Sequence, residues 1–432
     1  MKKVALSLLA LLAVTVGFAQ FNQSYVNHYG SGNYGQVLQV GLANYSTITD
    51  NGDINTSLVD QQGAFNSASV LVGLSVVPSV GNYTSTLQVG LANSSGILQD
   101  GYYNGSTVEQ QGDFNMSGIY QYGVANGADV FQQGTSNYSS IAQYGWFNSA
   151  IVAQYGLGNA SYVLQDGYAN AANVYQAGTT NLSFVAQLGT FNGAYVMQLG
   201  DDNLSDVLQI GDGNGASVYQ DGRLNDSYVE QLGVGNSASV TEIGRRNESD
   251  VLQSGWFNSA SVYQDGRRNN SLVDQNGLGN MAQVTQLGRR NASEVDQDGV
   301  GNYAFVLQSG LRNSSYVQQD GTSNGAYVQQ YGDDNQAITL QYGTSNMSSI
   351  LSVGDDNFAG ALQVGDGNQS SIEQWGNSNS ATAEQWGVGN MSMDLQIGDM
   401  NSASTLQIGA FNYSNVLQLG NANVATVVQV GP

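Results

Sequence analysis

Apolar and polar residues follow an eleven-residue pattern along almost the whole chain. Residues 154–178 show it twice: counting each glycine as position 0, Asn lies at +3, Ser or Ala at +5, Val at +7 and Gln at +9. Side chains alternate between the two faces of a β-strand, so these odd positions share one face. The pattern therefore predicts a strand and a glycine turn in every unit, with these side chains facing inward.

An eleven-residue period can also come from a helical coiled coil, which this composition excludes. Each unit carries Gly, Asn and a β-branched residue, all of which are poor helix formers. Three of the four inward positions are polar or small, so they cannot form an apolar helical stripe. The pattern favours strands and turns throughout.

The unit occurs 37 times, from the copy at Asn22 to the copy at Asn423, and every copy has Asn at +3. From Gly90 to Gly431 the glycines recur every eleven residues without a slip. Because the repeats continue without a linker or a change in composition, we expect residues 20–432 to form one repeat array.

Five extra residues interrupt the spacing near 74–78. They include Pro78, the only proline inside the array. Proline is tolerated in a loop or bulge but not in a central strand. We therefore expect one bulged insertion that leaves the register intact on either side.

The +5 position reveals how the units pair. From Ser117 to Ala326 it alternates between Ser and Ala, so the period there is 22 residues. Two units then make one coil, and successive coils stack in parallel with like residues over like. The predicted fold is all-β: a β-solenoid, or cross-β arcade, with 22 residues per coil.

Stacked amides can satisfy one another inside such a core, because each both donates and accepts hydrogen bonds. We expect Asn and Gln to form ladders along the stack. The candidate self-assembly ladder in the most regular region consists of Asn159, Gln165, Asn170, Gln176, Asn181 and Gln187.

A few inward positions depart from the pattern. The lone histidine, His28, occupies a Gln position and is interpreted as a ladder substitute. Asp394 occupies a +7 position, and the pattern gives no reason for it. The remaining replacements of Gln at +9 are Asp50, Val72, Glu242 and Ser352.

Residues 1–19 differ from the array. Lys2 and Lys3 precede an apolar run from Val4 to Val16, and small residues follow. This arrangement is typical of a bacterial secretory signal cleaved before Gln20, and it is too short to predict a membrane anchor. We expect a secreted mature chain that does not insert into a membrane.

Charge and composition exclude several classes of function. The formal net charge is −23, and both lysines lie in the expected signal, so the mature chain carries about −25. Such an acidic chain does not match a nucleic-acid-binding protein. It has no Cys for thiol or zinc–thiolate chemistry, and its carboxylates are scattered. We expect no enzyme activity, no cofactor and no metal.

Charged turn residues recur every 22 residues and should therefore stack on one edge. The arginines are Arg223, Arg245, Arg246, Arg267, Arg268, Arg289, Arg290 and Arg312. Aspartate pairs at 201–202, 333–334 and 355–356 lie on the same edge. We expect Asp221, Asp265, Glu248 and Glu294 to relieve repulsion within the arginine ladder. Either these are solvated turns, or they set the register between neighbouring molecules.

Outward positions change from tyrosine-rich to apolar towards the C-terminus. A contiguous exposed apolar stripe usually marks an association surface. We expect lateral association through Leu351, Val353, Leu362, Val364, Trp375, Trp386, Leu395, Ile397, Leu406, Ile408, Leu417 and Leu419.

Residues 203–220 carry the motif that identifies a family resemblance. They read N-x5-Q-x-G-x-x-N-x-A-x3-Q, with Gln209, Gly211, Asn214, Ala216 and Gln220 on the marked positions. The array therefore resembles the curlin repeat of curli subunits, S-x5-Q-x-G-x-x-N-x-A-x3-Q. Asn203 stands in place of the leading Ser.

Similarity to curlins implies an extracellular functional amyloid that is exported unfolded through an outer-membrane pore. We expect a secreted structural subunit of curli-like fibres in a biofilm or adhesion matrix, which reaches the cell surface through the periplasm. Expected partners are further copies of the chain, a nucleator curlin and the export pore. The alternatives are a nucleator or accessory subunit, or a monomeric solenoid that binds ice or polysaccharide.

The two ends of the array should expose unpaired strand edges, which template the addition of another strand. We expect head-to-tail polymerisation through Asn22, Val26, Asn423, Val427 and Gln429. Prolines at Ala425 and Val427 are expected to remove two hydrogen-bond donors from the C-terminal edge.

Overall fold

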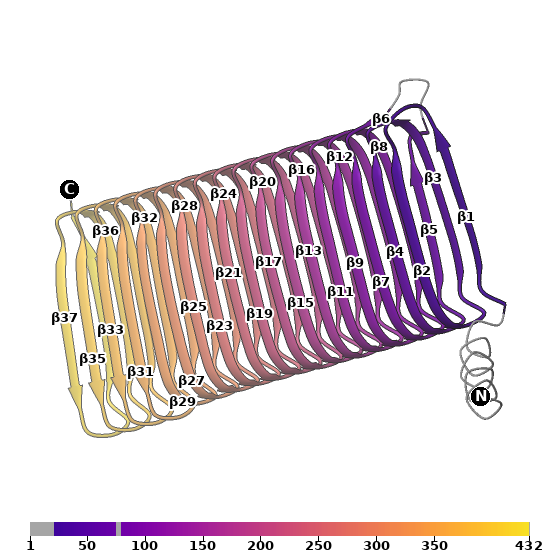
Figure 1. The fold of residues 1–432 in the computed structure, drawn as a ribbon. Helices are drawn as coiled ribbons and strands as arrows, with labels where there is room; N and C mark the ends of the chain where they lie inside the picture. Colours follow the sequence, from indigo (N-terminus) through magenta and orange to yellow (C-terminus); the bar gives the residue numbers. More distant parts are fainter. Residues whose placement is uncertain (1–20, 75–78, 432) are drawn as a thin grey trace, which may run out of the picture. The chain divides into compact units, whose positions relative to one another are not determined.

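The computed structural model describes residues 21–74 and 79–431. The expected signal segment, 1–19, and residues 75–78 of the expected insertion lie outside this part. The chain divides into two compact units, Met1–Gln209 and Ile210–Pro432. All regular secondary structure in the described residues is β-strand, and most strands have nine residues. Within each unit the strands lie side by side in two layers (Figure 1).

The first unit contains two parallel sheets that alternate along the chain. One sheet contains β1 (Gln23–Tyr29), β3 (Tyr45–Asp53), β5 (Ser67–Val72), β6 (Ser79–Val80), β8 (Ser94–Tyr102), β10 (Met116–Val124), β12 (Tyr138–Trp146), β14 (Ala160–Tyr168) and β16 (Leu182–Thr190). The other contains β2 (Tyr34–Leu42), β4 (Thr56–Ala64), β7 (Tyr83–Leu91), β9 (Gly105–Asp113), β11 (Gly127–Thr135), β13 (Ser149–Leu157), β15 (Ala171–Thr179) and β17 (Gly193–Asp201). Strand β18 (Leu204–Asp212) spans the division between the units.

The second unit is built in the same way. One sheet contains β20 (Asp226–Val234), β22 (Glu248–Trp256), β24 (Asn270–Leu278), β26 (Ala292–Val300), β28 (Ser314–Thr322), β30 (Gln336–Thr344), β32 (Phe358–Asp366), β34 (Ser380–Val388), β36 (Ser402–Ala410) and β38 (Val424–Val430). The other contains β19 (Gly215–Arg223), β21 (Ser237–Arg245), β23 (Ser259–Arg267), β25 (Met281–Arg289), β27 (Tyr303–Leu311), β29 (Gly325–Asp333), β31 (Met347–Val353), β33 (Gln369–Trp375), β35 (Met391–Ile397) and β37 (Tyr413–Leu419).

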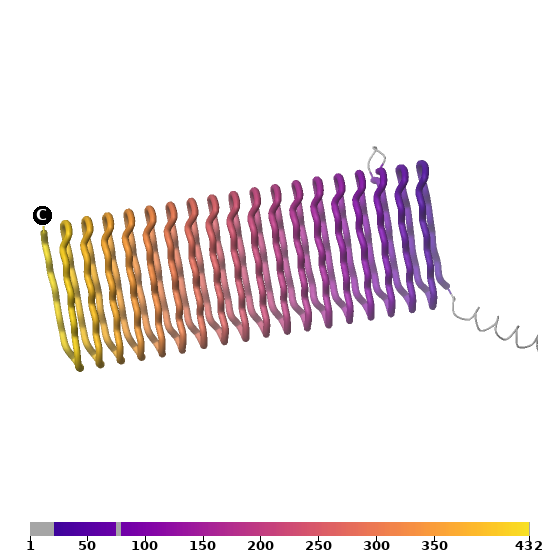
Figure 2. Tube along the Cα trace, turned by 60° about the vertical axis from the view of Figure 1, so that its left-hand side comes forward, coloured from indigo at the N-terminus to yellow at the C-terminus, as the bar shows by residue number. Residues whose placement is uncertain are grey.

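Successive coils pair in parallel with an offset of 22 residues. Figure 2 shows the coils following one another along the trace. Ser161 of β14 is level with Ser183 of β16, and Ala150 of β13 is level with Ala172 of β15. The Ser and Ala positions therefore belong to different sheets, which explains their alternation in the sequence. The predicted all-β solenoid with 22 residues per coil is confirmed.

The extra residues near 74–78 lengthen one coil without shifting the strands around it. Asp50 of β3 is level with Val72, and Gly52 is level with Ser79, so pairing with β3 resumes after the insertion. Accordingly β4 pairs with β7 at an offset of 27 residues, from Thr56 to Tyr83.

The core between the two sheets contains the predicted inward residues. Val163 is 3 % exposed, whereas Asn159, Ser161 and Gln165 are fully buried. The polar side chains outnumber the apolar ones in this core, and the large Asn and Gln amides among them need hydrogen-bond partners to be stable there, whereas Ser161 Oγ has none.

Candidate functional site

The glutamines form a hydrogen-bonded ladder along each sheet, which substitutions interrupt at a few coils. Gln165 Nε2 donates to Gln187 Oε1 at 2.8 Å and to the carbonyl oxygen of Ser149 at 2.9 Å. Gln165 Oε1 accepts from Gln143 at 2.8 Å. The neighbouring sheet repeats this arrangement, with Gln176 donating to Gln198. Each amide thus links its own coil to the coils on both sides.

The asparagines form a second ladder beside the turns. Asn159 donates from its backbone nitrogen and from Nδ2 to Oδ1 of Asn137, at 3.1 and 3.2 Å. Nδ2 also donates to the carbonyl oxygens of Tyr155 and Gly178, at 2.9 and 3.1 Å. Asn170 and Asn181 repeat the backbone and amide bonds to the preceding coil. The Asn amide supplies both the acceptor and the donors that this position uses.

The structure thus places all six candidate ladder residues in the two amide ladders of the first unit. The two ladders also have opposite polarity. Glutamine side chains donate towards the C-terminal coil, whereas asparagine Oδ1 atoms accept from it. A solenoid end therefore differs from the opposite end in its pattern of donors and acceptors.

Glycine at position 0 allows the coils to approach closely at the turns. A Cβ atom on Gly156 would lie 2.1 Å from the carbonyl oxygen of Gly178, and φ of Gly156 is +111°. Both features exclude other residues. Position +2 also has a positive φ, near 54–59° in many coils, yet residues other than glycine occupy it, such as Phe147, Ala169 and Asp202. The sequence pattern does not reveal this left-handed position because no residue type marks it.

Three consecutive substitutions end the glutamine ladder at the first coils of one sheet. His28 Nδ1 lies 3.2 Å from Asp50 Oδ2, and Ser57 donates to Asp50 Oδ1 at 2.7 Å. Burial raises the pKa of Asp50, although the bond from Ser57 and the nearby His28 oppose this shift. Val72 donates no side-chain bond, so Gln99 Oε1 has no partner. His28 thus occupies a ladder position but faces a carboxylate instead of an amide.

Asp394 lies inside the core of the second unit, where the sequence gives no reason for it. Its side chain is 2 % exposed, and Thr405 Oγ1 donates to Oδ1 at 3.1 Å. Oδ2 has no partner. Burial raises the pKa of Asp394 to about 6, and the bond from Thr405 limits the shift. Thr405 occupies the +7 position of β36, so two polar substitutions face each other across the core.

The C-terminal strand β38 exposes the last coil. Among the described residues it pairs only with β36, and the inward residues Asn423, just before it, Val427 and Gln429 are half-buried because no described coil covers them. Gln429 accepts from Gln407 at 2.8 Å and donates one N–H to Tyr413. Its second amide N–H has no partner among the described residues.

The N-terminal strand β1 is exposed along its whole length and, within residues 21–74 and 79–431, pairs only with β3. Val26 is 41 % exposed. Asn22 donates to the carbonyl oxygen of Gly41 at 3.2 Å, and its Oδ1 accepts from the backbone of Asn44 at 2.8 Å. The structure therefore places all five candidate edge residues on exposed terminal strands or directly beside them.

The apolar outward residues near the C-terminus do not form one stripe. Because consecutive strands belong to different sheets, they form two separate columns. One runs through Val353, Trp375, Ile397 and Leu419, and the other through Val364, Trp386, Ile408 and Val430. The prediction of a single contiguous stripe is therefore wrong.

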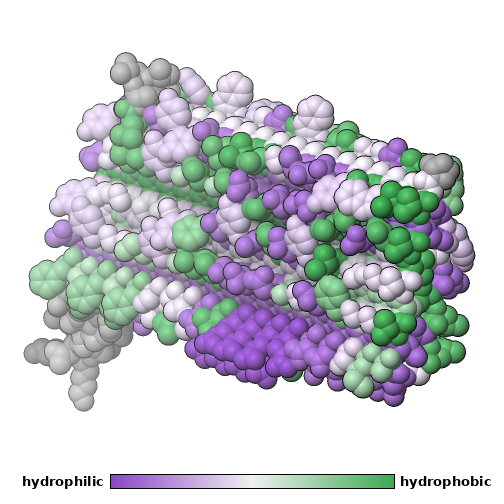
Figure 3. Space-filling model, turned by 180° about the vertical axis from the view of Figure 1, so that it is seen from behind, coloured by the Kyte–Doolittle hydropathy of each residue, from purple (hydrophilic) through white to green (hydrophobic). Residues whose placement is uncertain are grey.

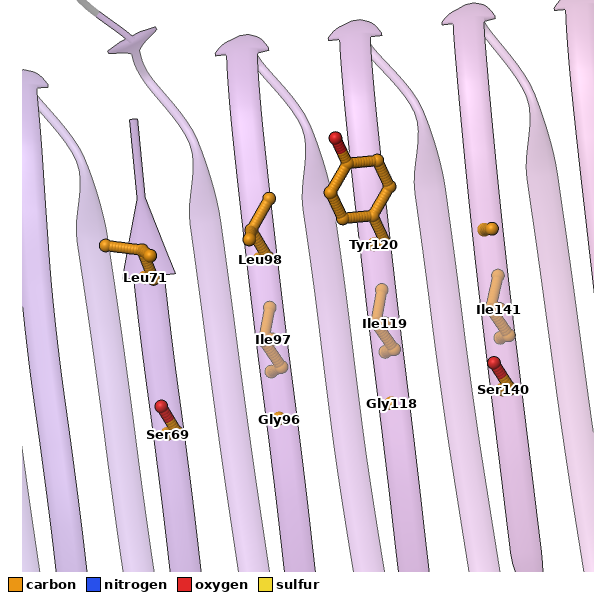
Figure 4. A pocket seen from close by; sticks show the side chains of 11 residues that line it. Ser69, Leu71, Gly96, Ile97, Leu98, Gly118, Ile119, Tyr120, Ser140 and Ile141 are labelled. Carbon is orange, nitrogen blue, oxygen red and sulfur yellow. The ribbon is translucent and has the colours of Figure 1, made fainter. Parts of the chain in front are cut away.

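Aromatic residues form outward columns on the first unit, and small residues leave a groove beside them. Tyr162 and Phe184 stack with ring centroids 5.0 Å apart. A shallow groove of about 330 Å³ lies where Gly96 and Gly118 lack side chains. Figure 4 shows Leu98 and Tyr120 beside it on the outer face.

The arginines stack on one edge of the second unit. The carboxylates that were expected to relieve their repulsion form no ion pair with the six central arginines. No carboxylate of the described residues lies within 4 Å of the six central arginines, Arg245, Arg246, Arg267, Arg268, Arg289 and Arg290. Arg312, at the end of the arginine series, pairs with Asp334. The pKa of Arg267 is lowered, chiefly by Arg268 and by its partial burial. Asp221, Asp265, Glu248 and Glu294 form no ion pair with these six arginines.

Residues 21–74 and 79–431 contain no group of three or more His, Asp or Glu side chains placed to hold a metal ion. In the same residues there is no helix long and apolar enough to cross a membrane.

Comparison with protein families finds one matching repeat. The family model described as Curlin associated repeat matches five segments, residues 123–156, 211–244, 258–288, 288–321 and 354–387. The segments come from both units, and each covers about three of the eleven-residue units. A comparison with curated proteins gives no match.

Proposed function

Because this chain is a curlin-repeat protein, we propose that it is a secreted structural subunit which assembles end to end into extracellular amyloid fibres of the curli type. Its solenoid fold and repeats fit a curli-like subunit. The fibres would belong to a biofilm or adhesion matrix at the cell surface. Passage through the periplasm and an outer-membrane export pore, and a nucleator curlin as a partner, are part of the same proposal.

The observation that carries the proposal is the open edge of β38. Ser402 of β36 donates its backbone N–H to the carbonyl oxygen of Asn423, in the direction of the following coil. Backbone groups of alternate residues in a parallel strand face the same side. On β38, the N–H groups that face away from β36 therefore belong to Val424, Thr426, Val428 and Val430. This is a strand edge without a following partner.

The direction of these N–H groups shows that the two positions predicted for blocking prolines are wrong. Ala425 and Val427 direct their N–H groups towards β36, so prolines there would damage the molecule's own sheet instead of its free edge. The sequence pattern distinguishes inward from outward side chains, but it does not indicate towards which neighbour each N–H is directed. Thr426 and Val428 are the positions to change.

The polarity of the ladders supports head-to-tail rather than head-to-head addition. At the C-terminal end, Gln418 and Gln429 carry amide donors directed towards a following coil. At the N-terminal end, Gln39 donates to Gln61 at 2.8 Å, while its own Oε1 has no described partner. The donor end of one copy therefore matches the acceptor end of another. Such a contact is heterologous and does not close, so it gives a filament.

The test uses the mature chain carrying Thr426→Pro and Val428→Pro. Each proline removes one outward donor and leaves the bonds to β36 in place. We expect the variant to keep its strand content by circular dichroism, to elongate wild-type seeds at least tenfold more slowly, and to stop their growth when added in excess. Thioflavin fluorescence and electron microscopy would measure both effects.

The matched control is Thr426→Ser with Val428→Thr, which changes the same side chains but keeps both N–H groups. It should elongate like the wild type. If the proline variant also elongates normally, addition does not occur at this edge. If the wild-type mature chain remains monomeric at high concentration, end-to-end assembly itself is contradicted. That result would favour the alternative of a monomeric ligand-binding solenoid.

A further inference from the structure

One edge of the second unit carries a basic block followed by an acidic block. The residue at +1 after each glycine stacks on its counterpart one coil away. From β19 onwards this column reads Arg223, Arg245, Arg267, Arg289, Leu311, Asp333, Asp355, Asn377 and Asp399. The edge forms a strongly hydrophilic patch in Figure 3.

The +2 column repeats the same change of sign. Each of its backbone N–H groups donates to a carbonyl oxygen of the preceding coil, at 2.8–3.0 Å. The charged residues of this column are Arg246, Arg268, Arg290, Arg312, Asp334 and Asp356. Two parallel columns thus switch from Arg to Asp at neighbouring coils.

The two blocks differ in how their charges are held. Asp333 Oδ1 accepts from the backbone N–H of Leu311 at 3.0 Å, and Asp355 Oδ1 accepts from that of Asp333 at 2.8 Å. These carboxylates are therefore fixed at the turn while their second oxygen remains available. The six central arginines have no carboxylate partner within the described chain. At the junction, Arg312 pairs with Asp334, which makes the centre of the edge nearly neutral.

We propose that this edge docks against the same edge of a second copy, with the two stacks antiparallel and related by a two-fold axis at Leu311. In this arrangement each basic block faces an acidic block.

The spacing of the charges supports this register. Asp333, Asp355 and Asp399 lie 22, 44 and 88 residues after Leu311, and Arg289, Arg267 and Arg223 lie 22, 44 and 88 residues before it. In the second column, Asp334 and Asp356 are related to Arg290 and Arg268 by the same offsets about Arg312. Because both columns have the coil spacing of about 4.8 Å, opposite charges face each other at these coils, whereas Arg245 and Arg246 face the uncharged Asn377 and Ser378.

A two-fold antiparallel pair places more of the edge's charges against opposite charges than a parallel pair displaced along the stack. The antiparallel contact places basic on acidic charge at both ends at once, as in an isologous interface. A parallel contact displaced along the stack would place only one charged block of each copy against a block of opposite sign. An anionic polymer is a weaker fit, because the chain as a whole carries −23 and repels it outside the arginine block.

The test reverses each block in the full mature chain. One variant replaces the six central arginines with Asp, and the other replaces Asp333, Asp334, Asp355 and Asp356 with Arg. Each new residue already occupies the same turn position in other coils, so the fold can accommodate it. All chains also carry Thr426→Pro and Val428→Pro, so that lateral pairing is measured separately from end-to-end growth.

Sedimentation velocity at 20 mM NaCl should show wild-type pairing that weakens at least tenfold at 500 mM NaCl, because salt screens exposed charges. Each reversed variant alone should remain unpaired, since its two blocks now carry the same sign. An equimolar mixture of the two variants should pair again. Failure of the mixture, or wild-type pairing that ignores salt or survives either reversal, would overturn the proposal.

Single cysteines test the antiparallel register, since the natural chain has none. Leu311→Cys should give a disulfide-linked dimer under mild oxidation, because the two-fold axis brings the two copies of this residue together. Thr322→Cys, on the opposite edge, is the control and should remain monomeric. If Leu311→Cys pairs non-covalently but does not crosslink, the two-fold arrangement is refuted.

Discussion

Glu242 and Gln264 are neighbours in a glutamine ladder, and Oε1 of each side chain lacks a hydrogen-bond partner. Elsewhere in the ladder a side-chain nitrogen donates to the next Oε1, as Gln264 does to Gln286 at 2.8 Å. Glu242 accepts from Gln220 at 2.8 Å but, when ionised, has no proton to donate. A protonated Glu242 would supply the missing donor and restore the ladder.

The surroundings of Glu242 favour its neutral form. The side chain is fully buried, and burial raises the pKa of Glu242 well above its ordinary value. The hydrogen bond from Gln220 opposes the shift, whereas the carboxylates of Asp226, Glu248 and Asp250 add to it. A raised folded-state pKa means that the stability is fully present below the unfolded-state pKa and is lost as pH rises through the folded-state pKa.

We therefore expect Glu242→Gln to stabilise the protein at pH 8 and to have little effect near pH 4. The amide supplies the donor permanently, so the penalty of an ionised, unsatisfied carboxylate disappears. An increase of about 2 kcal/mol in the free energy of unfolding is expected at pH 8. Urea unfolding followed by circular dichroism at both pH values would measure it.

The matched control is Glu373→Gln, which removes a carboxylate from an exposed strand position. It should change the stability by less than about 0.5 kcal/mol at either pH. Equal effects of the two substitutions would show that net charge, and not the ladder, controls the pH dependence.

The asparagine ladder predicts a large effect of a nearly isosteric change. In Asn159→Asp, the new carboxylate would face the carbonyl oxygens of Tyr155 and Gly178, which now accept from Nδ2. We expect a loss of about 3 kcal/mol, because a buried charge replaces two donors. Urea unfolding at pH 7 would detect it. Asn173→Asp, at an exposed position of β15, is the control and should be nearly neutral.

The fold can be predicted from the sequence because the same residue types recur at the odd positions of every unit. A one-residue slip would turn every Asn and Gln outward, so the odd positions fix both the face and the register. The Ser and Ala alternation then reveals the two-strand coil. The structure confirms this organisation, with Ser161 over Ser183 and Ala150 over Ala172.

Features that depend on backbone direction could not be predicted in the same way. The pattern shows that Val427 faces inward but not that its N–H is directed towards β36, so the blocking prolines belong elsewhere. The apolar columns were also misassigned, because neighbouring units in the sequence lie on different sheets. The lack of a carboxylate partner for Arg245 among the described residues could not be predicted either, because nearness in the sequence does not determine which way a side chain is directed.

Asp394 predicts a second pH-dependent contribution to stability. Its folded-state pKa is about 6, above the value of about 4 expected for an unfolded chain. The protein should therefore lose stability, on the order of 2 kcal/mol, as pH rises from 4 to 7. The double variant Asp394→Val with Thr405→Val, which gives both positions the usual residue, should remove this loss. Urea midpoints at pH 4, 5.5 and 7 would test it, and an unchanged profile would show that Asp394 stays ionised when folded.

The glycine turns predict opposite outcomes at two positions of one turn. Gly156→Ala places a Cβ atom 2.1 Å from the carbonyl oxygen of Gly178, so the neighbouring coil must move or the strand bonds must break. Gly158→Ala instead meets only Thr180 Cγ2, at 3.5 Å, and Ala169 already holds this left-handed position elsewhere in the unit. We expect Gly156→Ala to cost at least about 3 kcal/mol and Gly158→Ala about 1 kcal/mol or less. Parallel urea denaturation of the two variants would measure the difference, and a Gly156→Ala chain as stable as Gly158→Ala would show that the coils can separate at the turn without loss of pairing.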